Sequence, residues 1–219
     1  MREHPIPPVT EPFQYRAIGI FRGVYCPEDK DNFTRGFLID ADGIKVESVV
    51  LGRVISLMRR HLLMEKSHLW VVYPRCREND HLHLQISGIW EPSTLSDKNI
   101  DNQIVLKNEN NENNKKIDEV PEGDNYFSIR GELIYTRPET DELVIKVRQR
   151  PRSQTRKNLP FKLLIKGNLS LDFLRNFVSL EVKRQGQNLF LENYQIIGPV
   201  PKKNSKKGGQ RKINSNTRN

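Results

Sequence analysis

The chain has 219 residues, of which 36% are hydrophobic, and a formal net charge of +9, which is enough apolar material for two small cores. It contains no apolar run of about eighteen residues, and its first residues, MREHPIPPVTEPF, are polar and proline-rich, so the sequence predicts neither a membrane-spanning helix nor a secretory signal. We therefore expect a cytoplasmic protein without a membrane partner, in which Cys26 and Cys76 are reduced thiols.

Residues 11–92 predict a first domain with the element order strand, strand, strand, helix, strand, strand. Three extended stretches come first: YRAIGIFRGVY, FTRGFLID and, after the Asp42-Gly43 turn, IKVESVV. LGRVISLMRRHLL follows with apolar residues at helical spacing, and HLWVVY and HLHLQISGIW are two further strands.

Two segments predict no packed structure. Residues 93–124 are rich in Asn and charged side chains and poor in aromatic ones, so they cannot bury enough apolar area to offset the entropy of ordering. The same holds for residues 201–219, which are basic. We expect a flexible linker and a disordered basic tail.

Residues 125–200 predict a second domain with the same element order. YFSIRGELIYT and ELVIKVRQR form a hairpin, FKLLIKG is a third strand, SLDFLRN is a helical turn with Ser170 as N-cap, and FVSLEVKRQ and NLFLENYQII form a closing hairpin. This order is that of the OB-fold, a five-stranded Greek-key barrel that binds oligonucleotides. The fold class we predict is mainly β, with two tandem five-stranded OB-like barrels.

Charge is distributed unevenly along the chain. The first 95 residues hold twelve basic and twelve acidic side chains, residues 96–124 sum to −4, residues 125–200 sum to +6, and the tail has seven basic residues and no acidic one. All of the excess positive charge therefore belongs to the second domain and the tail, which indicates a polyanionic partner for that half.

Strand alternation predicts where these cations point. In ELVIKVRQR the apolar residues Leu143, Ile145 and Val147 share one side, so the basic residues project from the other. FKLLIKG alternates in the same way, and the two strands are neighbours in an OB barrel. The predicted nucleic-acid-binding cations are Lys146, Arg148, Arg150, Arg152, Arg156, Lys157, Lys162 and Lys166.

Aromatic side chains are candidates for stacking on bases. Phe190 and Tyr194 are expected opposite the inward Leu189 and Leu191, and Phe177 opposite the inward residues of its own strand. The alternative is that these rings pack under a loop or against the other domain. Tyr126 and Tyr135 are secondary candidates.

Three histidines in the first domain could suggest a metal site. His81 and His83 alternate on one strand, and His68 lies on its expected neighbour. No carboxylate or cysteine stands at ligand spacing around them, so we predict a structural or surface role, no metal and no cofactor.

Other candidate chemistry is also weak. Arg53, Arg59 and Arg60 on the predicted helix could contact phosphate, but a solvated helix surface is favoured because the domain is neutral. Cys76 lies between two arginines without any further sign of catalysis. No phosphate-binding loop, dinucleotide-binding turn, zinc-protease helix or nucleophile elbow is present, so the sequence predicts no enzyme.

Five stretches of the first domain are long enough to compare with known families: EPFQYRAIG, FTRGFLIDADG, LGRVISLMRRHL, HLWVVYPR and LHLQISGIWEP. Together they resemble a conserved family of cyanobacterial proteins, and FSIRGEL, FKLLIKG and residues 178–198 resemble it more loosely. The resemblance implies a cytoplasmic housekeeping protein and brings no catalytic residue or cofactor with it.

These observations predict a non-enzymatic nucleic-acid-binding protein. RNA is the expected ligand and single-stranded DNA the alternative, bound by the basic surface of the second barrel with help from the tail. The neutral first barrel is expected to be structural or to dock an unknown protein partner. The alternative function is a protein-interaction or assembly module that binds no nucleic acid.

Overall fold

The computed structural model describes residues 4–29, 31–76, 81–92, 118–149 and 159–201. Five strands and one helix make up the N-terminal barrel: β1 (Arg16–Asp29), β2 (Asn32–Ile39), β3 (Lys45–Val50), α1 (Gly52–His61), β4 (His68–Cys76) and β5 (Leu82–Ile89). The predicted element order is therefore confirmed. The Asp42-Gly43 turn is also confirmed, with Gly43 in the left-handed region at φ 78°.

Five more strands and two short 3-10 turns make up the C-terminal barrel: β6 (Tyr126–Arg137), η2 (Pro138–Thr140), β7 (Glu142–Val147), β8 (Phe161–Lys166), η3 (Leu171–Phe173), β9 (Asn176–Gln185) and β10 (Asn188–Pro199). The order again matches the prediction. Ser170 caps η3, because its hydroxyl oxygen accepts a hydrogen bond from the Asp172 backbone amide at 3.2 Å.

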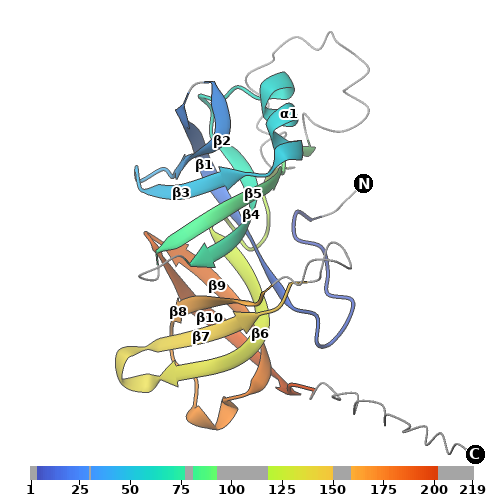
Figure 1. Cartoon of the computed structure of the whole chain (residues 1–219), viewed down its shortest axis with the longest axis vertical. Helices are drawn as coiled ribbons and strands as arrows, with labels where there is room; N and C mark the ends of the chain where they lie inside the picture. The colour runs from blue at the N-terminus through green and yellow to red at the C-terminus, as the bar shows by residue number, and fades with distance from the viewer. Residues whose placement is uncertain (1–3, 30, 77–80, 93–117, 150–158, 202–219) are drawn as a thin grey trace, which may run out of the picture.

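Both sheets close on themselves. The N-terminal barrel runs β1-β2-β3-β5-β4 and returns to β1, and the C-terminal barrel runs β6-β7-β8-β10-β9 and returns to β6. In each barrel the first strand is long enough to pair with two neighbours of its own barrel. The predicted OB-like topology is therefore present twice, one barrel above the other in Figure 1.

The first strands of the two barrels also pair with each other, which the sequence did not suggest. β1 and β6 run antiparallel over four residue pairs, from Arg16 opposite Arg130 to Gly19 opposite Phe127. Gly19 is required here because a Cβ atom at this position would lie 2.2 Å from Cδ1 of Phe127. The barrels thus form one ten-stranded sheet and share one continuous cluster of buried side chains.

A buried ion pair adds a second connection between the barrels. Nη2 of Arg184 on β9 lies 2.6 Å from Oδ2 of Asp40, which follows β2, and the two side chains are only 2% and 7% exposed. The same guanidinium lies 4.5 Å from the centre of the Phe21 ring. A third contact joins the same two barrels, because the Arg75 guanidinium of β4 lies 3.9 Å from the centre of the Phe161 ring of β8. These contacts fix the orientation of one barrel relative to the other.

Some residues outside the predicted domain ranges pack against the barrels. Ile6 of the N-terminal segment and Val120, which we expected in the flexible linker, pack together with Ile18 and Ile20 of β1. Asp124 also accepts hydrogen bonds at 2.9 Å from Nε of Arg22. Residues 118–124 are therefore part of the folded structure, whereas residues 93–117 of the predicted linker lie outside the described residues.

Candidate nucleic-acid interface

Strands β7 and β8 are neighbours with the side-chain alternation that the sequence predicts. Leu143, Ile145 and Val147 of β7 are buried inside the barrel, and Lys146 lies on the outside directly opposite Lys162 of β8. The prediction that basic side chains of the two strands share one outer surface is confirmed for these two lysines. We call the outer surface of β7, β8 and the adjoining end of β6 the β7–β8 face.

The β7–β8 face consists of three rows of side chains that run across the strands. Its rows are Glu132-Lys146-Lys162, Tyr135-Val144-Leu164 and Arg137-Glu142-Lys166. A row of apolar and aromatic side chains therefore lies between two rows that contain the charges. This arrangement can hold a base on the middle row while the flanking cations contact phosphates.

Carboxylates offset part of the positive charge, which alternation alone did not reveal. Oε2 of Glu132 lies 3.3 Å from Nζ of Lys146 and 3.6 Å from Nη2 of Arg148. Nζ of Lys166 donates a hydrogen bond to Glu142 at 2.7 Å, which lowers the pKa of that carboxyl group. Among the residues that the structure describes, exposed Lys162 makes no ion pair.

Half of the predicted cations cannot be placed. Arg150, Arg152, Arg156 and Lys157 lie outside the described residues, as does the basic tail after residue 201. In chain order these four residues come between the end of β7 and the start of β8. Their part in the interface stays a prediction.

Phe177 is not available for stacking on a base, so that prediction is wrong. The side chain is completely buried. The N-terminal segment covers it, with the Phe13 and Tyr15 rings in edge-on contact at centroid distances of 5.5 Å and 4.9 Å. Arg130 holds this segment in place by donating hydrogen bonds to the carbonyl oxygens of Pro12 and Gln14.

Tyr194 lies on the other side of its strand from Phe190, also against expectation. A β-bulge between Leu191 and Asn193 shifts the register, so Tyr194 lies opposite the inward-facing Leu180 of β9. Its ring is 46% exposed at the end of the barrel, 6.3 Å from the ring of Phe173. Phe190, in contrast, is half-buried on the outside, next to Lys166 of β8. Of Phe177, Phe190 and Tyr194, Phe190 alone adjoins the β7–β8 face.

Tyr135 and Arg137 belong to the β7–β8 face, although sequence reasoning gave Tyr135 a secondary place and did not select Arg137. Another bulge, between Leu133 and Tyr135, turns the tyrosine outward. Its ring is 37% exposed, and the Arg137 guanidinium lies 5.8 Å from its centre. Regular alternation, counted from the inward-facing Leu133, would place Tyr135 inside the barrel. The sequence pattern therefore gives no sign that its side chain lies on the outer surface.

Of the three histidines predicted to be structural or on the surface, His68 and His83 are buried and His81 is exposed. His68 is buried and forms hydrogen bonds with Glu91 and, at 2.9 Å, with the Leu63 carbonyl oxygen. Burial alone would lower the pKa of His68, but these hydrogen bonds raise it above 6.5. Within the described residues, no group of three His, Cys, Asp or Glu side chains could hold a metal ion. Cys26 and Cys76, both of which the structure describes, are not joined by a disulfide.

Two family models match the chain. The model described as "PatR RNA-binding protein, N-terminal OB-fold domain" matches residues 17–97, and the one described as "Cyanobacterial OB-fold-like RNA-binding domain, C-terminal" matches residues 129–198. Their ranges coincide with the two barrels and confirm the predicted OB-like fold. No curated protein matches the chain. No helix in the described part of the chain is both long and apolar enough to cross a membrane.

Proposed function

Because the chain belongs to a conserved cyanobacterial family with two OB domains, we propose that it binds single-stranded RNA through the β7–β8 face of its C-terminal barrel. Both family models describe RNA-binding domains, which supports nucleic-acid binding in general. The β7–β8 face is formed by the second and third strands of the barrel, the position at which OB-folds bind oligonucleotides. The proposed activity is binding, without a catalytic step.

The observation that carries this proposal is the lysine pair Lys146 and Lys162. The two residues lie directly opposite each other on neighbouring strands. Like charges in this position destabilise a sheet. Glu132 offsets the charge of Lys146, but stability of the barrel does not account for Lys162. A phosphate group between the two ammonium groups would remove the repulsion and release counterions from the nucleic acid.

The middle row supports an unpaired strand as the ligand. Tyr135 is exposed and Val144 and Leu164 are half-buried beside it, so an unstacked base can lie on this apolar strip. Stacking a base on an aromatic ring contributes about 1–3 kcal/mol to the binding free energy and tolerates any sequence. A duplex keeps its bases stacked on each other and would leave this strip uncovered.

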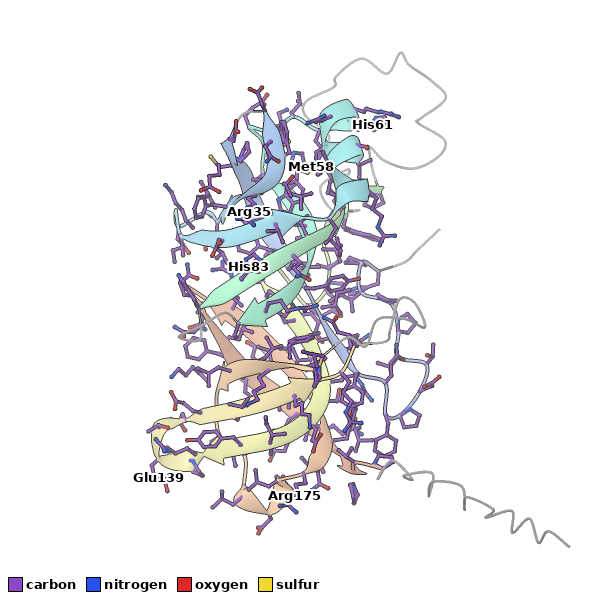
Figure 2. The ribbon with its side chains drawn as sticks, in the orientation of Figure 1. Arg35, Met58, His61, His83, Glu139 and Arg175 are labelled. Atoms are coloured by element: carbon purple, nitrogen blue, oxygen red, sulfur yellow. The ribbon has the colours of Figure 1, made fainter. Side chains whose placement is uncertain are left out.

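Titration of the full chain with labelled single-stranded RNA at several salt concentrations tests the proposal, with single-stranded DNA as a second arm. With about five phosphate contacts the slope of log K against log salt is about −3.5. Replacement of both lysines (Lys146→Gln with Lys162→Gln) should make it less steep by about 1.4. The control Arg175→Gln removes one charge at the far end of the C-terminal barrel (Figure 2) and should change nothing.

Two results would contradict the proposal. One is the absence of RNA binding at low salt. The other is an unchanged slope in the double lysine variant, which would move the interaction to another surface. Loss of all binding after deletion of residues 202–219 would assign the function to the tail rather than to the barrel.

A further inference from the structure

The exposed side of α1 carries a second group of cations, on the other barrel. The helix buries Val54 and Met58 against the strands. On its opposite side, Arg53, Ser56 and Arg60 follow one another at spacings of three and four residues and share one exposed surface. Arg59 lies on the flank of that surface, and the helix contains no acidic residue.

The stability of the helix does not account for all of these arginines. Arg59 and Arg60 lie in the last turn, where positive charge interacts favourably with the helix dipole. Arg53 lies in the first turn, where positive charge is unfavourable. This turn has no acidic side chain, and no side chain caps it. Arg53 is therefore a local cost that a ligand of opposite charge would remove.

These arginines also differ from the β7–β8 cations in their contacts. Arg53 and Arg60 form no ion pair or hydrogen bond with the part of the chain that the structure describes, whereas Lys146 and Lys166 each contact a carboxylate. Arg59 is held in place: its guanidinium lies 5.4 Å from the centre of the Phe33 ring. The surface thus combines one fixed cation with two that are free to reach a ligand.

The chemistry of this surface fits a phosphate backbone better than a protein. Protein interfaces usually bury an apolar centre, but the fully exposed positions of this surface are Arg53, Ser56 and Arg60, and the apolar side chain beside them, Leu57, is half-buried. The two arginines are about 10 Å apart along the helix, at 1.5 Å per residue. Cations along one helix side can contact phosphates of a strand without reading its bases.

We propose that the exposed side of α1 is a second RNA-backbone contact, separate from the β7–β8 face. The helix lies at the end of the N-terminal barrel that is far from the C-terminal barrel (Figure 1), so this contact would lengthen the bound stretch of RNA. The inference rests on the proposed function, because it assumes that the chain binds RNA. It gives the N-terminal barrel a direct part in binding, where its neutral charge had suggested a structural or protein-docking role.

The experiment titrates the full chain with labelled single-stranded RNA of about thirty nucleotides. Replacement of both free arginines (Arg53→Gln with Arg60→Gln) should make the salt slope less steep by about 1.4 and weaken binding about 25-fold at 0.1 M salt. The charge-preserving variant, Arg53→Lys with Arg60→Lys, should stay close to wild type. Arg175→Gln, at the opposite end of the molecule (Figure 2), is the matched control.

The outcomes separate this inference from the proposed function. A slope in the double glutamine variant equal to that of the Arg175→Gln control overturns the inference, whatever the lysine variant does. The arginine variant could bind more weakly while the variant with Lys146→Gln and Lys162→Gln binds like wild type. That result supports the contact on α1 and overturns the proposal for the β7–β8 face. No binding by the wild type overturns both. Thermal unfolding provides a second readout, because Arg53→Gln should not lower the melting temperature.

Discussion

The buried pair between Asp40 and Arg184 should hold the two barrels together, and it can be broken from either side. Asp40→Asn keeps the Oδ1 atom that accepts hydrogen bonds from the Asp42 and Ile44 amides, but removes the charge that faces Arg184. Arg184→Met removes the cation. Because both side chains are almost fully buried, each single variant should lose about 3–5 kcal/mol of unfolding free energy. In a chain of this size this corresponds to about 6–20 °C in melting temperature.

Urea unfolding followed by circular dichroism measures the unfolding free energy of each variant. The wild type, the two single variants and the double variant together form a double-mutant cycle. The double variant should be less destabilised than the sum of the single variants, because it leaves no lone buried charge, whereas each single variant leaves one. Glu142→Gln breaks the more exposed pair with Lys166, whose side chains are 28% and 32% exposed, and should destabilise the chain far less than either change at the buried pair.

The pair also predicts a dependence on pH. Burial alone would raise the pKa of Asp40, but the Arg184 guanidinium and the two backbone amides lower it below its ordinary value of 3.8. The stability that Asp40 contributes is therefore complete above pH 3.8 and is lost as the pH falls through the lowered pKa. The difference between wild type and Asp40→Asn should shrink in that range. Single variants that lose less than about 1 kcal/mol, or strictly additive effects, would refute the reasoning.

Three further predictions concern single positions. Lys162→Glu should raise the unfolding free energy by about 0.2–1 kcal/mol, because its cross-strand neighbour is a lysine, and should weaken RNA binding; a rise in affinity would contradict this. Gly19→Ala should cost about 1–3 kcal/mol in urea unfolding, because the added Cβ would overlap a phenylalanine ring, whereas Gly52→Ala, with nothing within 4 Å, should be neutral or slightly stabilising. Tyr135→Ala should lose about 1–3 kcal/mol of RNA-binding free energy with little change in stability. Phe177→Ala should lose about 3–5 kcal/mol of unfolding free energy. If Phe177→Ala instead weakened RNA binding and left stability unchanged, Phe177 would be a base-stacking residue after all.

The local features of the fold could be predicted from the sequence. Regular alternation in β7 and β8 gave the buried residues Leu143 and Ile145 and the outward Lys146 and Lys162, because neither strand contains a bulge. The element order gave the two barrels, because short strands separated by turns leave few other topologies.

The features that could not be predicted depend on bulges or on contacts between residues far apart in the chain. β6 and β10 each contain one extra residue, which reverses the alternation of side chains beyond it. Tyr135 and Tyr194 therefore each lie on the side of the strand opposite to the one that regular alternation assigns. Phe177 is buried by residues more than a hundred positions earlier, and the ion pair of Arg184 spans 144 positions. No local pattern carries information about such contacts.

The most direct measurement of where RNA binds is photo-crosslinking of 4-thiouridine-containing single-stranded RNA to the full chain, with the crosslinked peptides identified by mass spectrometry. We expect crosslinks in β6–β8, above all at Tyr135, with others at Phe190. The Lys146→Gln, Lys162→Gln variant should reduce them. Crosslinks confined to residues 202–219, or spread evenly over the chain and unaffected by that variant, would contradict the claim that RNA lies on the β7–β8 face.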